Sequence, residues 1–119
     1  MFGCDLSLES ANKSKATILA DSPAAVVTVM QADATSSSSM QAFVDACVAQ
    51  HGRIDILINN VGRSEPGDPA SMSEETWDRQ IDVNLKSVYL TSHLVLPIMS
   101  AKHSGAIVNI SSIAGLRYM

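Results

Sequence analysis

The chain has 119 residues, of which 46% are hydrophobic and 17% charged, and its formal net charge is -4. This length allows one domain at most, and the hydrophobic share is enough for a packed core. With 4% aromatic residues and a net negative charge, the chain has neither the basic surface nor the stacking platform that nucleic-acid binding requires. The composition therefore favours a globular protein and argues against a nucleic-acid partner.

The two cysteines, Cys4 and Cys47, do not form a Cys-x-x-Cys pair, so reduced thiols in an intracellular protein are expected. No apolar run approaches the length of a membrane span, and the first residues lack the basic and apolar regions of a signal peptide. We therefore expect a cytoplasmic protein without a membrane partner. No group of side chains has the spacing of a metal site.

Strands and helices are predicted to alternate along the chain, which indicates an α/β fold with a mainly parallel sheet. Short apolar or β-branched runs mark the strands, and apolar residues three and four positions apart mark the helices. The expected strands are residues 2–4, 26–30, 54–58 and 106–110, and the expected helices are residues 7–20, 40–51 and 74–102.

Local signals indicate where the helices begin and end. Ser7 is a suitable N-cap for the first helix, and Gly52 can terminate the second. Either Ser71 or Ser73 can cap the third helix, because both precede residues at capping-box or staple spacing. Pro97 predicts a kink near the end of that helix.

Residues 54–62 organise the chain, because an apolar strand expected to be buried runs directly into Asn59, Asn60 and Gly62. Asparagine side chains bind local backbone groups, and glycine permits close approach by a ligand. This pattern indicates a ligand site at the end of the strand. An ordinary turn after a buried strand is the alternative.

Polar residues follow each of the other expected strands as well. In an open parallel sheet the carboxyl ends of the strands lie along one edge, where ligands bind. The polar residues that follow the strands are Asp5, Asp33, Asn59, Asn60 and the pair Ser111–Ser112.

The two carboxylates among these residues each have a binding and a structural interpretation. Asp5 can accept hydrogen bonds from both hydroxyls of a ribose and would repel a 2′-phosphate, or it can stabilise the start of a helix. Asp33 can accept from an adenine amino group, or it can be an ordinary turn residue. The residues alone leave both alternatives open.

Asn84 lies within a strongly apolar predicted helix, where a buried amide needs hydrogen-bond partners. It either makes hydrogen bonds at a helix kink or between helices, or it holds a water or a backbone carbonyl near a reactive site. Ser111 or Ser112 can orient a substrate carbonyl or alcohol. A serine hydrolase is not supported, because the chain has no Gly-x-Ser-x-Gly elbow.

These motifs together resemble the short-chain dehydrogenase/reductase family. Residues 59–62 are similar to its Asn-Asn-Ala-Gly motif, with Val61 in place of alanine. Residues 83–85 resemble the helix that carries its catalytic asparagine, and residues 107–115 resemble its active-site serine strand. The three motifs occur in the family's order and spacing.

The resemblance implies hydride transfer between a nicotinamide cofactor and a small alcohol or carbonyl substrate. It implies that Ser112 hydrogen-bonds the substrate oxygen and that Asn84 helps to hold a proton-relay water. NAD is the expected cofactor because of Asp5, with NADP as the alternative. The residues implied in cofactor binding are Asp5, Asp33, Ala34, Asn60, Val61 and Gly62.

The family pattern also has a Gly-rich turn before the position of Phe2 and a Tyr-x-x-x-Lys pair after Ser112, which this sequence does not contain. Tyr118 is too close to Ser112 and has no lysine after it. We therefore expect residues 1–119 to be a single partial Rossmann-like domain. Its doubly wound parallel sheet would lack the first strand and the C-terminal strands.

Such a segment, or a truncated gene model, is expected to be inactive and marginally stable alone, with its first two strands unjoined to the others. The full-length enzyme is expected to be a homo-oligomer. The alternative is a non-catalytic remnant that pairs with a full-length relative through its long helix.

Overall fold

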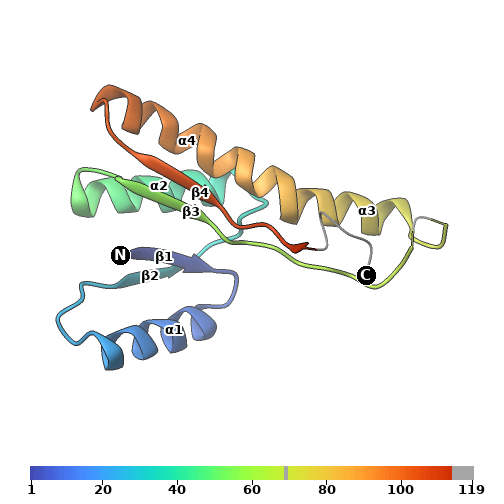
Figure 1. The fold of residues 1–119 in the computed structure, drawn as a ribbon, viewed down its shortest axis with the longest axis horizontal. Coiled ribbons are helices and arrows are strands. Elements are labelled where there is room, and N and C mark those ends of the chain that lie inside the picture. The colour runs from blue at the N-terminus through green and yellow to red at the C-terminus, as the bar shows by residue number, and fades with distance from the viewer. Residues whose placement is uncertain (69, 114–119) are drawn as a thin grey trace. The chain divides into compact units, whose positions relative to one another are not determined.

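The computed structural model describes residues 1–68 and 70–113, and the chain forms two compact units that divide after Gly52 (Figure 1). Parallel strands and helices alternate within each unit, as the α/β prediction requires. The described strands form two sheets of two strands each, which confirms that the first two strands are not joined to the others.

The first unit contains one parallel strand pair and two helices. Strand β1 (Phe2–Asp5) pairs with β2 (Thr28–Gln31), so that Phe2 lies opposite Thr28 and Asp5 opposite Gln31. Helix α1 (Leu8–Asp21) packs on both strands. From helix α2 (Ser37–His51), Phe43 places its ring 5.4 Å from the ring of Phe2, and the core of this unit includes the fully buried Met40.

Local sequence signals set the ends of these helices. The hydroxyl of Ser7 accepts a hydrogen bond from the N–H of Ser10 (3.3 Å), which confirms the predicted N-cap of α1. Gly52 ends α2 in the left-handed conformation, with φ of 71°, as predicted. Strand β2 begins two residues later than predicted, because β1 begins at Phe2 and its partner there is Thr28.

The second unit contains a strand pair and a long helical segment. Strand β3 (Ile56–Asn59) pairs in parallel with β4 (Ala106–Asn109), and helix α4 (Ser87–Ala101) packs along one face of this pair (Figure 1). Helix α3 (Glu74–Ile81) and the π-helix η1 (Asp82–Lys86) precede α4.

The predicted continuous helix over residues 74–102 is therefore wrong in one respect, because η1 interrupts it. Ser73 is its N-cap, since its hydroxyl accepts from the N–H of Thr76 at 3.2 Å. Short π-helical turns inside longer helices are frequent at functional sites. Asn84 lies within η1.

Strand β3 is only half buried, in contrast to the prediction. Leu57 and Asn59 face α4, whereas Ile56 and Ile58 are 63% and 61% exposed. The reason is that successive side chains point to opposite faces of a strand, and α4 covers one face.

Part of the apolar surface of the long helical segment is exposed to solvent. Four of its residues, spaced four apart, form an exposed stripe: Trp77, Ile81, Leu85 and Tyr89. The buried side chains of α4 include small polar residues as well as apolar ones. They are Ser87, Leu90, Thr91, Val95 and Met99. Among the described residues, no helix has the length and apolar character required to cross a membrane.

Candidate functional site

Asn84 holds the backbone of the loop that follows β3. Its Oδ1 accepts a hydrogen bond from the N–H of Arg63 (2.9 Å), and its Nδ2 donates to the carbonyl oxygen of Arg63 (2.8 Å). The other Nδ2 hydrogen reaches the carbonyl oxygen of Gln80 (3.0 Å). Because a primary amide has two donor hydrogens, both are occupied, and Oδ1 retains capacity for one more donor.

Asn84 is exposed rather than buried, which corrects the expectation of a buried amide inside an apolar helix. The physical reason is that η1 turns this side chain toward the loop after β3, where it finds backbone partners. Both interpretations of Asn84 find a contact, because its amide holds the backbone carbonyl of Arg63 and also donates to the carbonyl oxygen of Gln80, four residues earlier in the helical segment.

Gly62 is packed closely against this amide. A Cβ atom at Gly62 would lie 3.2 Å from Oδ1 of Asn84, which is tighter than ordinary van der Waals contact. The neighbouring residues Asn60 and Val61 are exposed. The structure therefore brings Gly62, the last residue of the 59–62 motif, close to the side chain of Asn84.

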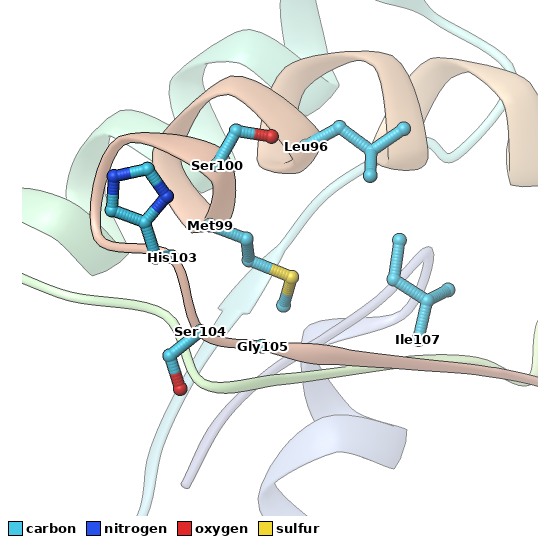
Figure 2. Close-up of a pocket in the computed structure, with 7 residues that line it drawn as sticks. All are labelled: Leu96, Met99, Ser100, His103, Ser104, Gly105 and Ile107. Carbon is cyan, nitrogen blue, oxygen red and sulfur yellow. The ribbon is translucent and has the colours of Figure 1, made fainter.

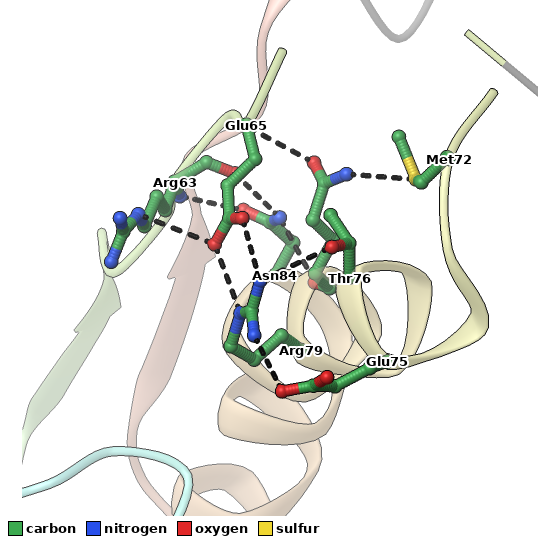
Figure 3. Close-up of polar contacts among 8 residues, drawn as sticks. Arg63, Glu65, Met72, Glu75, Thr76, Arg79 and Asn84 are labelled. Atoms are coloured by element: carbon green, nitrogen blue, oxygen red, sulfur yellow. Dashed lines mark hydrogen bonds and ion pairs between the residues drawn. The ribbon is translucent and has the colours of Figure 1, made fainter. Parts of the chain in front are cut away.

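An ion-pair cluster holds the same loop two residues further on (Figure 3). The guanidinium of Arg79 donates to both carboxylate oxygens of Glu65, from Nε at 3.2 Å and from Nη2 at 2.9 Å. These hydrogen bonds from Arg79 lower the pKa of Glu65. Gln80 adds a contact, because its Oε1 accepts from the N–H of Glu65 at 3.4 Å. Sequence patterns gave no indication of this cluster.

Asn59, which was predicted only as part of the motif, is the centre of a buried polar network. Its Oδ1 accepts from the hydroxyl of Thr91 (2.6 Å), and its Nδ2 donates to Oδ1 of Asn109 (2.9 Å) and to the hydroxyl of Ser92 (3.3 Å). Asn59 and Thr91 are each 8% exposed. The signal that could have indicated this network is the group of small hydroxyl residues Ser87, Thr91 and Ser92 on a mostly apolar helix.

Ser111 and Ser112 follow β4 and are exposed. The parallel pairing continues to Ile110, whose N–H donates to the carbonyl oxygen of Asn59 at 2.9 Å. The two serines therefore leave the sheet at the same edge as Asn60 and Gly62, as expected for parallel strands. Ala114 and Gly115 of the serine motif, and Tyr118, lie outside the described residues.

Asp5 and Asp33, in the first unit, follow its two paired strands. Oδ1 of Asp5 accepts from the N–H of Ser7 (2.8 Å), the N-cap residue of α1. Oδ1 of Asp33 accepts from the N–H and the hydroxyl of Thr35, at 2.8 and 2.7 Å. Both structural interpretations are therefore present. Ala34 is buried.

An open hollow lies at the opposite end of β4 from the two serines (Figure 2). Met99, Ser100 and His103 line it from the end of α4, and Gly105 and Ile107 line it from the start of β4. None of the predicted site residues lines it. Within residues 1–68 and 70–113, no cluster of three or more His, Cys, Asp or Glu side chains could hold a metal ion.

A cluster of charged side chains connects the residues before β3 to Lys102, at the end of the long helical segment. Arg53 and Lys102 both donate to the carboxylate of Asp55. The hydrogen bonds from Arg53, and to a smaller extent that from Lys102, lower the pKa of Asp55 from 3.8 to about 2. The ion pairs are exposed, so salt screens them.

We expect the stability of the protein to depend on this carboxylate below pH 4. A pKa that is lower in the folded state gives a contribution that is present above 3.8 and lost as the pH falls toward about 2. The midpoint of thermal unfolding, measured from pH 5 to pH 2, should therefore fall less steeply for Asp55→Asn than for the unmodified protein. Parallel profiles for the two proteins would contradict this assignment.

Comparison with known proteins places the whole chain in one family. The family model described as short chain dehydrogenase matches residues 1–119. A 3-oxoacyl-[acyl-carrier-protein] reductase of Chlamydia muridarum, FabG, is 40% identical over 109 residues, which are 92% of this chain and 44% of that protein.

Solved structures agree with this assignment. The crystal structure of levodione reductase matches with a TM-score of 0.93 and 31% identity, over 99% of this chain and 46% of that one. A metagenomic short-chain oxidoreductase in complex with NADP matches with a TM-score of 0.89 and 33% identity, over 99% and 53%. The chain thus spans about half the length of these relatives, and its fold is part of theirs.

Proposed function

The chain belongs to the short-chain dehydrogenase family, and on that premise we propose that the intact protein transfers hydride between a nicotinamide cofactor and a small alcohol or carbonyl substrate. The observation that carries the proposal is the contact of Asn84 with the Arg63 backbone beside Gly62. Ser112 leaves the neighbouring strand at the same edge of the sheet. An oxidoreductase of this kind needs these groups close to one another.

In this proposal Ser112 is a catalytic residue, because its hydroxyl donates a hydrogen bond to the substrate oxygen. Asn84 fixes the loop after β3, because its Oδ1 accepts from the N–H of Arg63 and its Nδ2 donates to the carbonyl oxygen of Arg63. A proton-relay water held by this side chain would have to donate to the remaining lone pair of Oδ1. The activity of residues 1–119 alone is proposed to be absent.

The residues that follow the strands fit the polar parts of a dinucleotide. Asp5 is exposed and would accept hydrogen bonds from ribose hydroxyls, and Asp33 would accept from the adenine amino group. A carboxylate at Asp5 repels a 2′-phosphate, which favours NAD over NADP. When bound, the cofactor supplies a nicotinamide ring that exchanges hydride. The remaining proposed contacts are Ala34, by its backbone, with Asn60, Val61 and Gly62.

One observation favours a second candidate function. The exposed stripe on α3, η1 and α4 presents Trp77, Ile81, Leu85 and Tyr89, which are 57%, 39%, 62% and 61% exposed. Such a surface suits association with another copy or with a full-length relative. The second candidate is therefore a non-catalytic chain that acts by pairing through this stripe. In either case the expected location is the cytoplasm.

Calorimetric titration of the intact protein with NADH and with NADPH tests the main proposal. We expect NADH to bind more tightly than NADPH, and Asp5→Asn to reduce that preference, because the charge that repels a 2′-phosphate is lost. Ser112→Ala should keep cofactor binding and reduce turnover by about 100-fold or more. A protein that binds neither nucleotide but co-purifies with a full-length relative would favour the second candidate.

A further inference from the structure

We propose that Arg79 is a positioning residue, which acts through Glu65 to fix the loop after β3 and thereby strengthens cofactor binding by Asn60 and Gly62. This inference rests on the proposed function. It starts from the observation that side chains from the end of α3 and from η1 hold this loop, within the second unit (Figure 3).

Three side chains hold two residues of the loop, Arg63 and Glu65. Asn84 binds the backbone of Arg63, Arg79 binds the side chain of Glu65, and the Gln80 side chain accepts from the N–H of Glu65. The carbonyl oxygen of Gln80 also accepts from Asn84 at 3.0 Å. The contacts therefore form one connected set, in which a change at Arg79 is transmitted to the segment that Asn84 holds.

The ion pair between Arg79 and Glu65 is the strongest side-chain contact in this set. It is bidentate, and two parallel charge-assisted hydrogen bonds fix direction as well as distance. The Glu65 side chain is only 16% exposed, so water screens this pair less than it screens an open surface pair. The guanidinium of Arg63 lies 3.6 Å from the same carboxylate and cannot replace this geometry.

The chain offers a matched control at the same arginine. Arg79 also pairs with Glu75, one turn earlier on α3, at 3.2 Å. The Glu75 side chain is 85% exposed, and it forms no hydrogen bond or ion pair with the described residues of the loop. Removing Glu75 therefore takes one ion pair from Arg79 and leaves the loop contacts intact.

Hydrogen exchange of the intact protein measures the loop directly, through the N–H groups of Arg63 and Glu65. We expect Arg79→Gln and Glu65→Gln each to accelerate this exchange by about tenfold, and the double variant by no more, because both remove the same contact. Arg79→Lys should give an intermediate rate, since lysine keeps the charge and loses the bidentate geometry. Glu75→Gln should leave the rate unchanged.

Calorimetric titration with NADH provides the second measurement. We expect Arg79→Gln to raise the Kd for NADH by about tenfold and Glu75→Gln to leave it unchanged. Unmodified protein that binds NADH, with a variant at Arg79 that binds equally well, would overturn this inference and leave the proposed function standing. Unmodified protein that does not bind NADH or NADPH would overturn both. Equal acceleration of exchange by Glu75→Gln would also overturn the inference, because the effect would then come from the helix.

Discussion

Replacing Gly105 by alanine is expected to lower the free energy of unfolding by about 1–3 kcal/mol, which is the usual cost of overpacking. A Cβ atom at Gly105 would lie 2.4 Å from Sδ, 2.5 Å from Cγ and 2.9 Å from Cβ of Met99. Rotation of the methionine side chain can move the sulfur and Cγ but not its Cβ. Because Met99 is 6% exposed and its Cβ is fixed to the backbone of α4, the backbone itself must shift.

Gly3 provides the matched control for this substitution. A Cβ atom at Gly3 would meet nothing within 4 Å, so Gly3→Ala should be neutral or slightly stabilising, measured by thermal or denaturant unfolding of the intact protein. In a Met99→Ala background, Gly105→Ala should cost less, because two of the three overlapping atoms are gone. Equal costs at Gly105 in both backgrounds would show that contact with Met99 is not the cause.

The parts of the fold that the sequence predicted are those set by short-range interactions. Ser7 and Gly52 cap their helices through residues three or four positions away, so the signal lies within one turn of chain. The interruption at η1 was not predictable in this way. Its stabilisation involves Arg63, which is 21 positions from Asn84, and no local pattern contains that information.

The candidate site divides along the same line. Asn84 and Ser112 can be proposed as site residues from the sequence because they fall in recognisable motifs, whereas Glu65 and Arg79 are 14 positions apart and have no characteristic spacing. The exposure of Ile58 was missed for a related reason. An apolar run indicates a strand that can be buried on both faces, but it does not say how many faces a neighbouring helix covers.

Asn59→Ala is expected to destabilise the protein by about 2–4 kcal/mol, because it removes one buried and two partly buried hydrogen bonds and leaves a cavity. The Asn59 amide connects α4, through Thr91, to β4, through Asn109, at the end of the sheet where Ser112 follows. Thr91→Val, which keeps the shape and removes the hydroxyl, should cost less, about 1–2 kcal/mol. Denaturant unfolding of the intact protein measures both values.

Substitution of the adjacent residue, Asn60→Ala, distinguishes a structural role of these amides from a binding role. Asn60 lies just beyond the end of β3 and is exposed, whereas Asn59, the last residue of β3, is buried. Asn60→Ala should therefore change the free energy of unfolding by less than about 0.5 kcal/mol, and by our proposal it should weaken NADH binding. If Asn60→Ala destabilised the protein as much as Asn59→Ala, both amides would be structural, and Asn60 would have to be withdrawn from the proposed cofactor site.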